Sequence, residues 1–196
     1  MRDRVDIMVD IETLGTDVNS TIFQIAGMSF DIRTGLAIRT FDATADISKN
    51  EDICATGSTI RWWMNNNKEL FQSLLNEGED SSDDILLQFY DWIANHQELT
   101  DVKNIYLWGN GNLFDNSMIS SQFKAIGLDY PIFYGNDRDV RTILELASMK
   151  LGVSEQQLKN RWADTNMVAH NAIDDVYFQV DLVSQCYNIL VGEESY

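Results

Sequence analysis

The hydrophobic positions near the start of the chain predict three strands. Residues 5–11 (VDIMVDI) form a short, mostly apolar run rich in Val and Ile, which is typical of a central strand buried on both faces. The runs at 21–32 and 36–43 are also strand-like, and Gly35 between them can adopt the positive φ of a tight hairpin. We therefore expect an antiparallel meander.

From Ser58 the apolar spacing changes to a helical period. One helix is predicted from Ser58 to near Gly78, beginning at a Ser/Thr cap, and a second from about Asp83 to Asn95. The other expected elements, in chain order, are a strand at 104–109, a helix at 113–127, a short edge strand within 130–140, helices from about Thr142 and from Ser154, and a final helix from Asn171 to about Leu190.

This order of elements indicates the fold class. A meander of three strands followed by alternating strands and helices predicts an α/β fold, with helices on the faces of a mixed sheet. The 196 residues suit one well-buried domain covering 1–196. Active sites in such folds lie at the carboxyl ends of the parallel strands, so chemistry-bearing residues are sought there.

Charge and cysteine content limit the classes of function that this chain can have. The chain has 14 basic and 31 acidic residues, a net charge of −17, so its mean surface potential repels polyanions and any nucleic-acid function must rest on a local site. Cys54 and Cys186 lack the spacing of a disulfide framework or a zinc site. Asp6 and Asp10 interrupt the first apolar run, which argues against a signal peptide or membrane span and predicts a cytoplasmic protein.

Two acids stand at the carboxyl end of the first predicted strand. Asp10 and Glu12 are two residues apart, so their side chains leave the same face of the sheet. Carboxylates beside an apolar strand need a cation or hydrogen bonds. The alternative is that the strand has already ended and both acids lie in a solvated loop.

A third acid, Asp115, follows the glycine and asparagine loop after the strand at 104–109, in the first turn of the next helix. It therefore also lies beyond the carboxyl end of a strand. The spacing from Asn112 to Asp115 is that of a capping box, and an acid in a first turn gains from the helix dipole, so a purely structural role is an open alternative.

The segment 168–179 (VAHNAIDDVYFQ) supplies a histidine and two adjacent acids. With Asn171 as the helix cap, Asp174 falls where an acid can reach back to cap the helix. At about 100° per residue, Asp175 lies closer to the apolar stripe of the helix and faces the body of the domain. His170 precedes the cap and can reach the same site from the loop. A lone histidine is more often an ordinary surface or packing residue, and this is the role expected of His96.

Carboxylates converging in this way cannot all remain ionised without counter-charge. Oxygen ligands select hard cations, Mg²⁺ or Mn²⁺, and two such ions roughly 3.5 to 4 Å apart clamp the attacking and leaving oxygens of phosphoryl displacement. A histidine with a pKa near neutrality suits the base that takes a proton from the attacking water.

Three segments together resemble a known family. DIETLGT, WGNGNLFD and HNAIDD are similar, in the same order, to the three motifs of the DEDDh 3′→5′ exonucleases, the DnaQ-like group of the RNase H-like superfamily. TIRWWMNN, WGNGNLFDN and NDRDVRT further resemble a phage and prophage branch related to exodeoxyribonuclease VIII, to the phage exonuclease DexA and to a mycobacterial exoribonuclease. The second motif departs from the commoner HNAxFD pattern by having Trp108 and Gly109 ahead of Asn110.

The resemblance implies a function and a fold. It implies that Asp10, Glu12, Asp115 and Asp175 hold two divalent ions, Mg²⁺ or Mn²⁺, and that His170 activates the water. The substrate would be the 3′ end of single-stranded DNA or RNA, and the products nucleoside 5′-monophosphates. The implied fold is an RNase H-like mixed sheet with helices on both faces, and some members of the family form homodimers.

Substrate contacts are expected from residues around these motifs. Trp62 and Trp63 are consecutive on a helix, about 100° apart, so at most one is buried centrally and the other can stack on a base. Packing of both against the sheet is an equal alternative. The set of candidate contacts is Thr13, Leu14, Gly15, Trp62, Asn112, Arg138 and Arg141.

Two other functions stay open. The strongly negative charge also fits a catalytically weak module on the same fold that binds nucleic acid or protein. A glycosidase would use a carboxylate pair such as Asp10 and Glu12 without a metal, so chelation separates it from the two-metal reaction.

Overall fold

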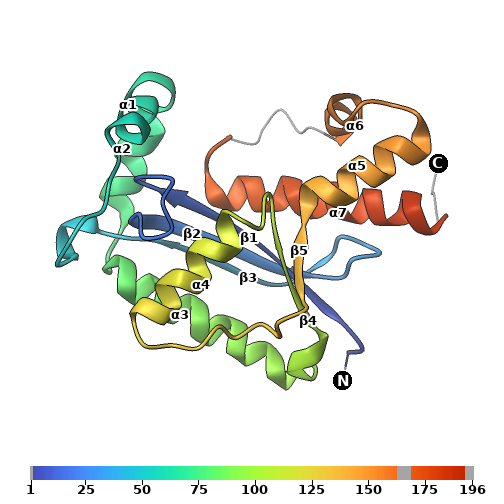
Figure 1. Ribbon diagram of the computed structural model, residues 1–196, viewed down its shortest axis with the longest axis horizontal. Coiled ribbons are helices and arrows are strands. Elements are labelled where there is room, and N and C mark those ends of the chain that lie inside the picture. Colours follow the sequence, from blue (N-terminus) through green and yellow to red (C-terminus); the bar gives the residue numbers. More distant parts are fainter. Residues whose placement is uncertain (1, 163–168, 193–196) are drawn as a thin grey trace.

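A five-stranded mixed sheet forms the centre of the computed structural model, which describes residues 2–162 and 169–192 (Figure 1). The strand order is β3-β2-β1-β4-β5. β1, β2 and β3 are the expected antiparallel meander, and β4 and β5 extend the sheet in parallel with β1. The strands are β1 (Val5–Thr13), β2 (Ile22–Phe30), β3 (Ala37–Thr44), β4 (Ile105–Gly109) and β5 (Asp137–Asp139).

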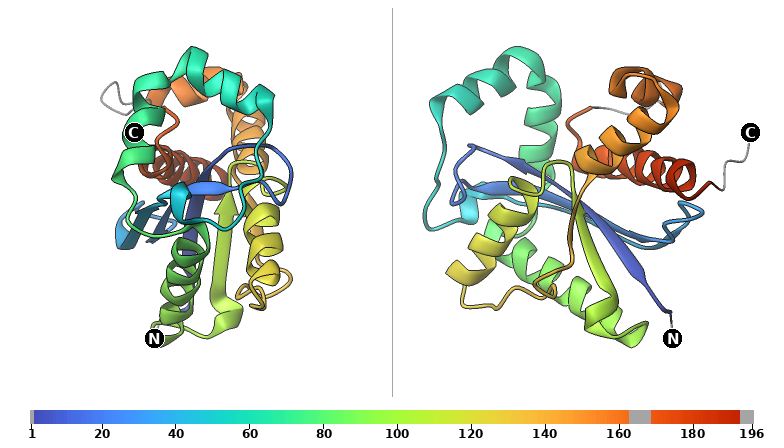
Figure 2. Two further views of the ribbon diagram at one scale, coloured as in Figure 1. Left: turned by 90° about the vertical axis from the view of Figure 1, so that its left-hand side faces the viewer. Right: turned by 45° about the vertical axis from the view of Figure 1, so that its right-hand side comes forward.

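Helices cover both faces of this sheet (Figure 2). Three 3₁₀ segments also occur in the described residues, at Ile47–Lys49, Asn95–Glu98 and Val102–Asn104. The α-helices are α1 (Gly57–Asn66), α2 (Lys68–Glu77), α3 (Ser82–Ala94), α4 (Asp115–Ala125), α5 (Val140–Leu151), α6 (Glu155–Trp162) and α7 (Ala172–Val191). No helix among the described residues is both long and apolar enough to span a bilayer.

Side-chain alternation along β1 decides what each face of the sheet carries. Val5, Ile7 and Val9 pack into the core formed with α3 and α4. Met8 packs on the opposite face, in the core formed with α5 and α7. Because successive side chains of a strand point to opposite faces, Asp10 shares the face of Met8 and is directed toward α7.

Two of the differences from the predicted element boundaries bear on the site. The helix expected from Ser58 to Gly78 is two helices, because the chain turns at Asn67, whose φ is −141° and ψ is 44°. This turn ends a run of three asparagines, whose side chains compete with helical hydrogen bonds; Asn66 Nδ2 donates to the Trp62 carbonyl at 2.8 Å. α4 begins at Asp115, two residues later than expected, with Phe114 as its N-cap. Asn112 therefore does not cap this helix.

Candidate active site

The acids of β1 belong to the strand itself. β1 continues to Thr13, so the alternative of a solvated loop is wrong, and Glu12 is buried opposite Gln24 of β2. Burial raises the pKa of Asp10 and of Glu12 well above the ordinary values, and the charges of Asp115 and Asp175 raise them further. These acids are close enough to repel one another when ionised.

Asp115 is the first residue of α4 and is 4% exposed. Burial raises its pKa to about 7, although backbone N–H groups and the charge of Arg141 partly oppose this shift. Gly109 at the end of β4 permits this position: a Cβ there would clash with Asn116 and lie 3.2 Å from Oδ2 of Asp115. The glycine in the unusual second motif thus allows the start of α4 to approach the sheet.

Asp175 and His170 meet at the start of α7. The backbone N–H of His170 donates to Oδ2 of Asp175 at 3.0 Å, and Asn171 caps the helix by accepting from Ile173. Glu12, His170 and Asp175 each offer a ligand atom, and these atoms lie within 4.8 Å of one another. His170 has a φ of 67°, in the left-handed region. The capping role expected of Asp174 stays a prediction.

Two glutamines that sequence reasoning missed hold this arrangement. Gln179 of α7, 3% exposed, donates from Nε2 to Oδ1 of Asp10 at 2.9 Å. Gln24 accepts from the backbone N–H of Ala172 at 3.2 Å and donates to Oδ1 of Asp42 at 3.1 Å, which ties the start of α7 to the sheet. A polar residue on the otherwise apolar face of a helix is the signal that could have identified Gln179, because a buried amide requires partners.

A pocket of about 390 Å³ lies beside Glu12. Thr13, Gly15 and Trp62, three of the candidate substrate contacts, are among its lining residues. Trp63 is 2% exposed and donates to the Thr13 carbonyl at 3.2 Å, whereas Trp62 is 39% exposed, which confirms that only one of the two is buried. The ring of Trp62 stands edge-on to the imidazole of His170, with 4.8 Å between centroids.

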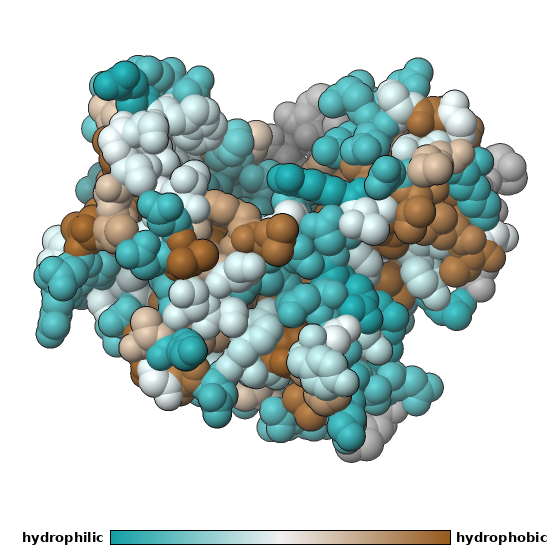
Figure 3. Space-filling view, viewed as in Figure 1, coloured by the Kyte–Doolittle hydropathy of each residue, from teal (hydrophilic) through white to brown (hydrophobic). Residues whose placement is uncertain are grey.

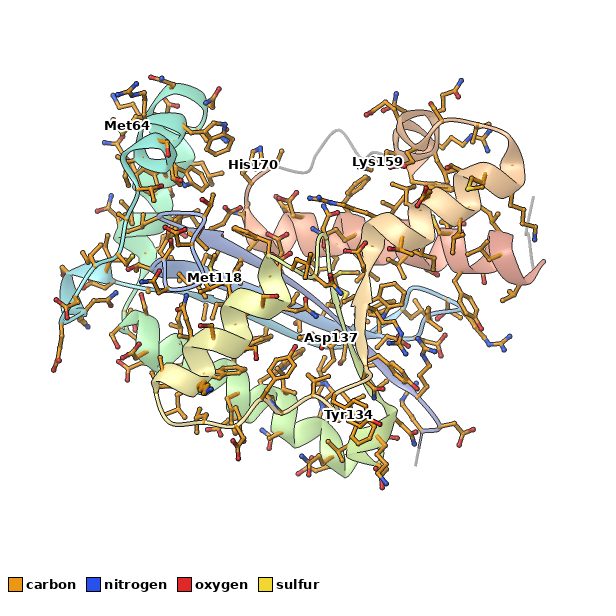
Figure 4. All side chains as sticks on the ribbon, in the orientation of Figure 1. Met64, Met118, Tyr134, Asp137, Lys159 and His170 are labelled. Atoms are coloured by element: carbon orange, nitrogen blue, oxygen red, sulfur yellow. The ribbon has the colours of Figure 1, made fainter. Side chains whose placement is uncertain are left out.

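The upper part of the space-filling view is hollowed between the α1–α2 and α5–α6 sides (Figure 3). Figure 4 shows His170 in this hollow, between the same two sides of the molecule. The histidine expected as a base is exposed and can meet a ligand entering from solvent.

The remaining candidate contacts separate into two groups. Arg141 lies beside Asp115 and lines a second hollow together with Asn112. Leu14, by contrast, is 2% exposed and packs in the core under α1 and α2, so it does not face the pocket. Arg138 lies over the ring of Tyr106, 4.6 Å from its centroid, and donates to backbone carbonyls. The structure therefore does not bring Leu14 and Arg138 to the site.

Residues outside this cluster behave as expected of packing groups. His96 is fully buried and its Nδ1 lies 2.8 Å from the Trp92 carbonyl oxygen. Cys54 and Cys186 are not joined in a disulfide. The acids and His170 are therefore the strongest candidates for catalysis among the titratable residues.

The donor set fits divalent cations. Four acids from β1, α4 and α7, which are Asp10, Glu12, Asp115 and Asp175, face one another, and burial is the chief cause of the raised pKa of each of them. Bringing such a group to its ionised form at neutral pH requires nearby positive charge. Carboxylate oxygens are the ligands preferred by Mg²⁺ and Mn²⁺.

The sequence and the fold both match known nucleases. The sequence model of the 3′-5′ exoribonuclease Rv2179c-like domain matches residues 5–187. No curated protein matches the sequence significantly. Solved structures similar in fold include cell-death related nuclease 4 (CRN-4), the nuclease domain of 3′hExo, described as a DEDDh family member bound to rAMP, and the zinc-bound form of the E. coli ExoI–ssDNA complex.

These similarities concern the fold, because the sequence identities are 14%, 14% and 16%, respectively. The TM-scores are 0.67, 0.63 and 0.63, and the matches cover 94%, 96% and 97% of this chain. The chain spans 64% of the CRN-4 chain, 92% of the 3′hExo domain and 43% of the ExoI chain. The expected RNase H-like α/β fold is therefore confirmed.

Proposed function

Because the chain belongs to the family of the 3′-5′ exoribonuclease Rv2179c-like domain, we propose that it is a metal-dependent 3′-5′ exonuclease. It would release nucleoside 5′-monophosphates from the 3′ end of single-stranded RNA or DNA. The observation that carries this proposal is the convergence of Asp10, Glu12, Asp115 and Asp175 beside His170. Membership of the phage and prophage branch and a homodimer stay predictions.

Asp10, Glu12, Asp115 and Asp175 would hold two divalent cations, Mg²⁺ or Mn²⁺. Such ions polarise a phosphoryl oxygen and lower the pKa of the attacking water. In this scheme the acids must be ionised and held in position. Gln179 helps to hold Asp10 by donating a hydrogen bond to its carboxylate. Burial in the absence of cations raises their pKa values, so cation binding and deprotonation are linked.

His170 would take the proton from the attacking water. Its imidazole is exposed, lies beside Glu12 and Asp175, and contacts the edge of Trp62. The hydrogen bond from its backbone N–H to Asp175 fixes the position of the residue relative to the acids. A base must reach the water, and this placement at the mouth of the acid cluster meets that requirement.

The pocket beside Glu12 would receive the 3′-terminal nucleoside. Its volume of about 390 Å³ falls within the range of small-molecule sites, and Trp62 offers a ring on which a base can stack. The positive charge of Arg141 acts on Asp115, and Arg141 lines the neighbouring hollow, where its guanidinium can meet a phosphate of the strand. Thr13 and Gly15 line the same pocket and are candidates for contacts to the sugar.

The decisive experiment is a time course on matched single-stranded RNA and DNA with a 5′ label, with Mg²⁺, with Mn²⁺ and with EDTA. Stepwise shortening that EDTA abolishes supports the proposal. Asp115→Asn should stop it, whereas Asp83→Asn, at an exposed position of α3, should not. Failure of the folded protein to shorten any strand would reject the exonuclease and leave the binding module, and EDTA-resistant cleavage would reject the role of the cations.

A further inference from the structure

Three hollows lie in a row around the loop between β4 and α4. The pocket beside Glu12 and the hollow beside Arg141 share Phe114 as a lining residue. The hollow beside Arg141, about 490 Å³, shares Asn112 and Leu113 with a third of about 560 Å³. Neighbouring hollows therefore adjoin one another along this loop, and the path over them away from the acids is here called the route.

The third hollow is a groove between α4 and the segment 130–137, here called the α4 groove. On one side it is lined by residues of α4 at helical spacing, which are Asn116, Ser117, Ser120, Ser121 and Lys124. On the other side are Tyr130, Tyr134 and Asp137. Figure 4 shows Tyr134 far from His170, below Asp137, so the route leaves the acid cluster and descends along the front of the molecule.

The α4 groove is poor in free negative charge, although the chain carries −17. Its lining carboxylate, Asp137, accepts hydrogen bonds on Oδ1 from Asn116 Nδ2 and from the Tyr130 hydroxyl, both at 2.7 Å. At the head of the route, Asp139 is occupied as the N-cap of α5 and also accepts from the Asn112 N–H at 3.0 Å.

Another hollow of similar size, about 520 Å³, makes the contrast clear. It is lined by four acids, Glu51, Asp52, Asp83 and Asp84, and by one lysine, Lys49, so negative charge predominates. A phosphodiester chain would be repelled there. The α4 groove instead offers the hydroxyl groups of Ser120 and Ser121 and the positive charge of Lys124.

Large exposed side chains stand beside the α4 groove. Leu113 is 87% exposed and Tyr134 is 89% exposed, although both carry large apolar surfaces. The ring of Tyr134 contacts Phe133 at a centroid distance of 4.5 Å, and the rest of its surface is open to solvent. An exposed ring next to a groove with polar donors is the arrangement with which proteins stack the bases of single strands.

We propose that the α4 groove binds the nucleotides upstream of the 3′ end, with a base stacked on Tyr134 and a phosphate near Lys124. This inference rests on the proposed function, since it places the 3′-terminal nucleotide in the pocket beside Glu12. It adds a second binding region at a distance from the acids. Affinity should therefore increase with strand length until the strand reaches Tyr134.

The test is the binding of 5′-labelled single strands of two and eight nucleotides by fluorescence anisotropy, measured in EDTA so that no strand is cleaved. Tyr134→Ala should weaken binding of the eight-nucleotide strand by about tenfold, as expected for loss of one stacked base, and leave the dinucleotide unchanged. Tyr134→Phe keeps the ring and should bind like the unmodified protein.

Charge is tested in the same assay by Lys124→Ala and, as a control, Lys68→Ala at an exposed position of α2. Lys124→Ala should reduce the slope of log K against log salt by about 0.7 for the long strand, and Lys68→Ala should not. Equal binding of both strand lengths, no effect of Tyr134→Ala on the long strand, or an equal loss for both lengths would overturn the inference.

Hydrolysis separates this inference from the proposed function. Tyr134→Ala could weaken binding of the long strand while Mg²⁺ and Mn²⁺ produce no shortening. That result would support binding of a single strand in the α4 groove and reject the exonuclease activity. If strands are shortened but Tyr134→Ala changes neither binding nor its dependence on strand length, the proposed binding in the α4 groove is rejected and the exonuclease activity is kept.

Discussion

The side-chain amide of Gln179 donates a hydrogen bond to Oδ1 of Asp10 at 2.9 Å, and so links α7 to β1 inside the acid cluster. With Oδ1 held in this way, the second oxygen of Asp10 keeps a defined direction. Outer hydrogen bonds of this kind orient metal ligands and commonly affect affinity strongly.

We expect Gln179→Met to weaken Mn²⁺ binding by about 10- to 100-fold, the usual effect of losing such a partner. Met has a similar shape, and Oε1 of Gln179 has no hydrogen-bond partner among the described residues, so the fold should be kept. Isothermal titration with Mn²⁺ measures the change. Gln72→Met, on the exposed side of α2, is the matched control and should bind like the unmodified protein.

Substitutions of the two adjacent acids of α7 should have very different effects on activity. Asp175→Asn should lower kcat by at least about 100-fold, because it removes a proposed ligand and the charged acceptor of the His170 N–H. Asp174→Ala should keep activity and cost helix capping, about 0.5 to 2 kcal/mol of unfolding free energy. Rates on a labelled oligonucleotide and thermal melts check both, and a comparable loss of kcat in Asp174→Ala would contradict the assignment.

Metal-free stability should depend on pH through Asp115. Its pKa is raised to about 7 by burial, so between about pH 4 and pH 7 the folded state retains a proton that the unfolded chain has released. The unfolding free energy therefore falls as pH rises through this range. Asp115→Asn removes this contribution and should make the decline between melts at pH 5 and pH 7.5 less steep, while Asp10 and Glu12, whose pKa values are also raised, account for the rest.

Added Mg²⁺ should raise the melting temperature more at pH 7.5 than at pH 5, since protons compete with the cation for the same oxygens. An equal rise at both pH values, in the protein without substitutions, would argue against binding at these acids.

Substitution of Trp62 should affect activity, whereas substitution of Trp63 should affect stability. Trp63 is buried between Phe23 and Phe71, so Trp63→Ala should cost about 3 to 5 kcal/mol of unfolding free energy. Trp62 is exposed and touches His170, so Trp62→Ala should lower kcat/KM while the melting temperature changes little. Trp62→Phe, which retains a ring, should recover part of the loss.

Gly109→Ala should disturb the start of α4, because the new Cβ would clash with Asn116 and crowd Asp115. We expect weaker Mn²⁺ binding together with a lower melting temperature. Gly57→Ala is the control: a Cβ there meets no atom within 4 Å, and the substitution should be neutral or stabilise by about 0.4 to 1 kcal/mol.

Simple periodicities located much of the site. The period of two along β1 put Asp10 and Glu12 on one face, and the structure extends the strand far enough to keep them there. The period of 3.6 along α7 selected Asp175 over Asp174 as the acid facing the domain, and Asp175 is the one that joins Glu12 and His170. Both inferences needed only backbone geometry.

Specific side-chain contacts, both local and between distant segments, were beyond this reasoning. The break at Asn67 depends on side-chain hydrogen bonds that compete with the helix, and Leu14 turned inward because α1 and α2 form their own small core over it. Gln179 and Asp10 are 169 residues apart in sequence, and no local pattern encodes their hydrogen bond. The third motif indicated where an acid and a base lie, but not the residues that hold them.

His170 adopts a φ of 67°, a backbone conformation that side chains other than glycine disfavour, at a cost of about 1 to 3 kcal/mol. Its replacement by glycine should therefore yield a protein that melts at a higher temperature than His170→Ala and yet is as inactive. The backbone at this position thus favours glycine for stability, and the proposed role as a base is what would require an imidazole there.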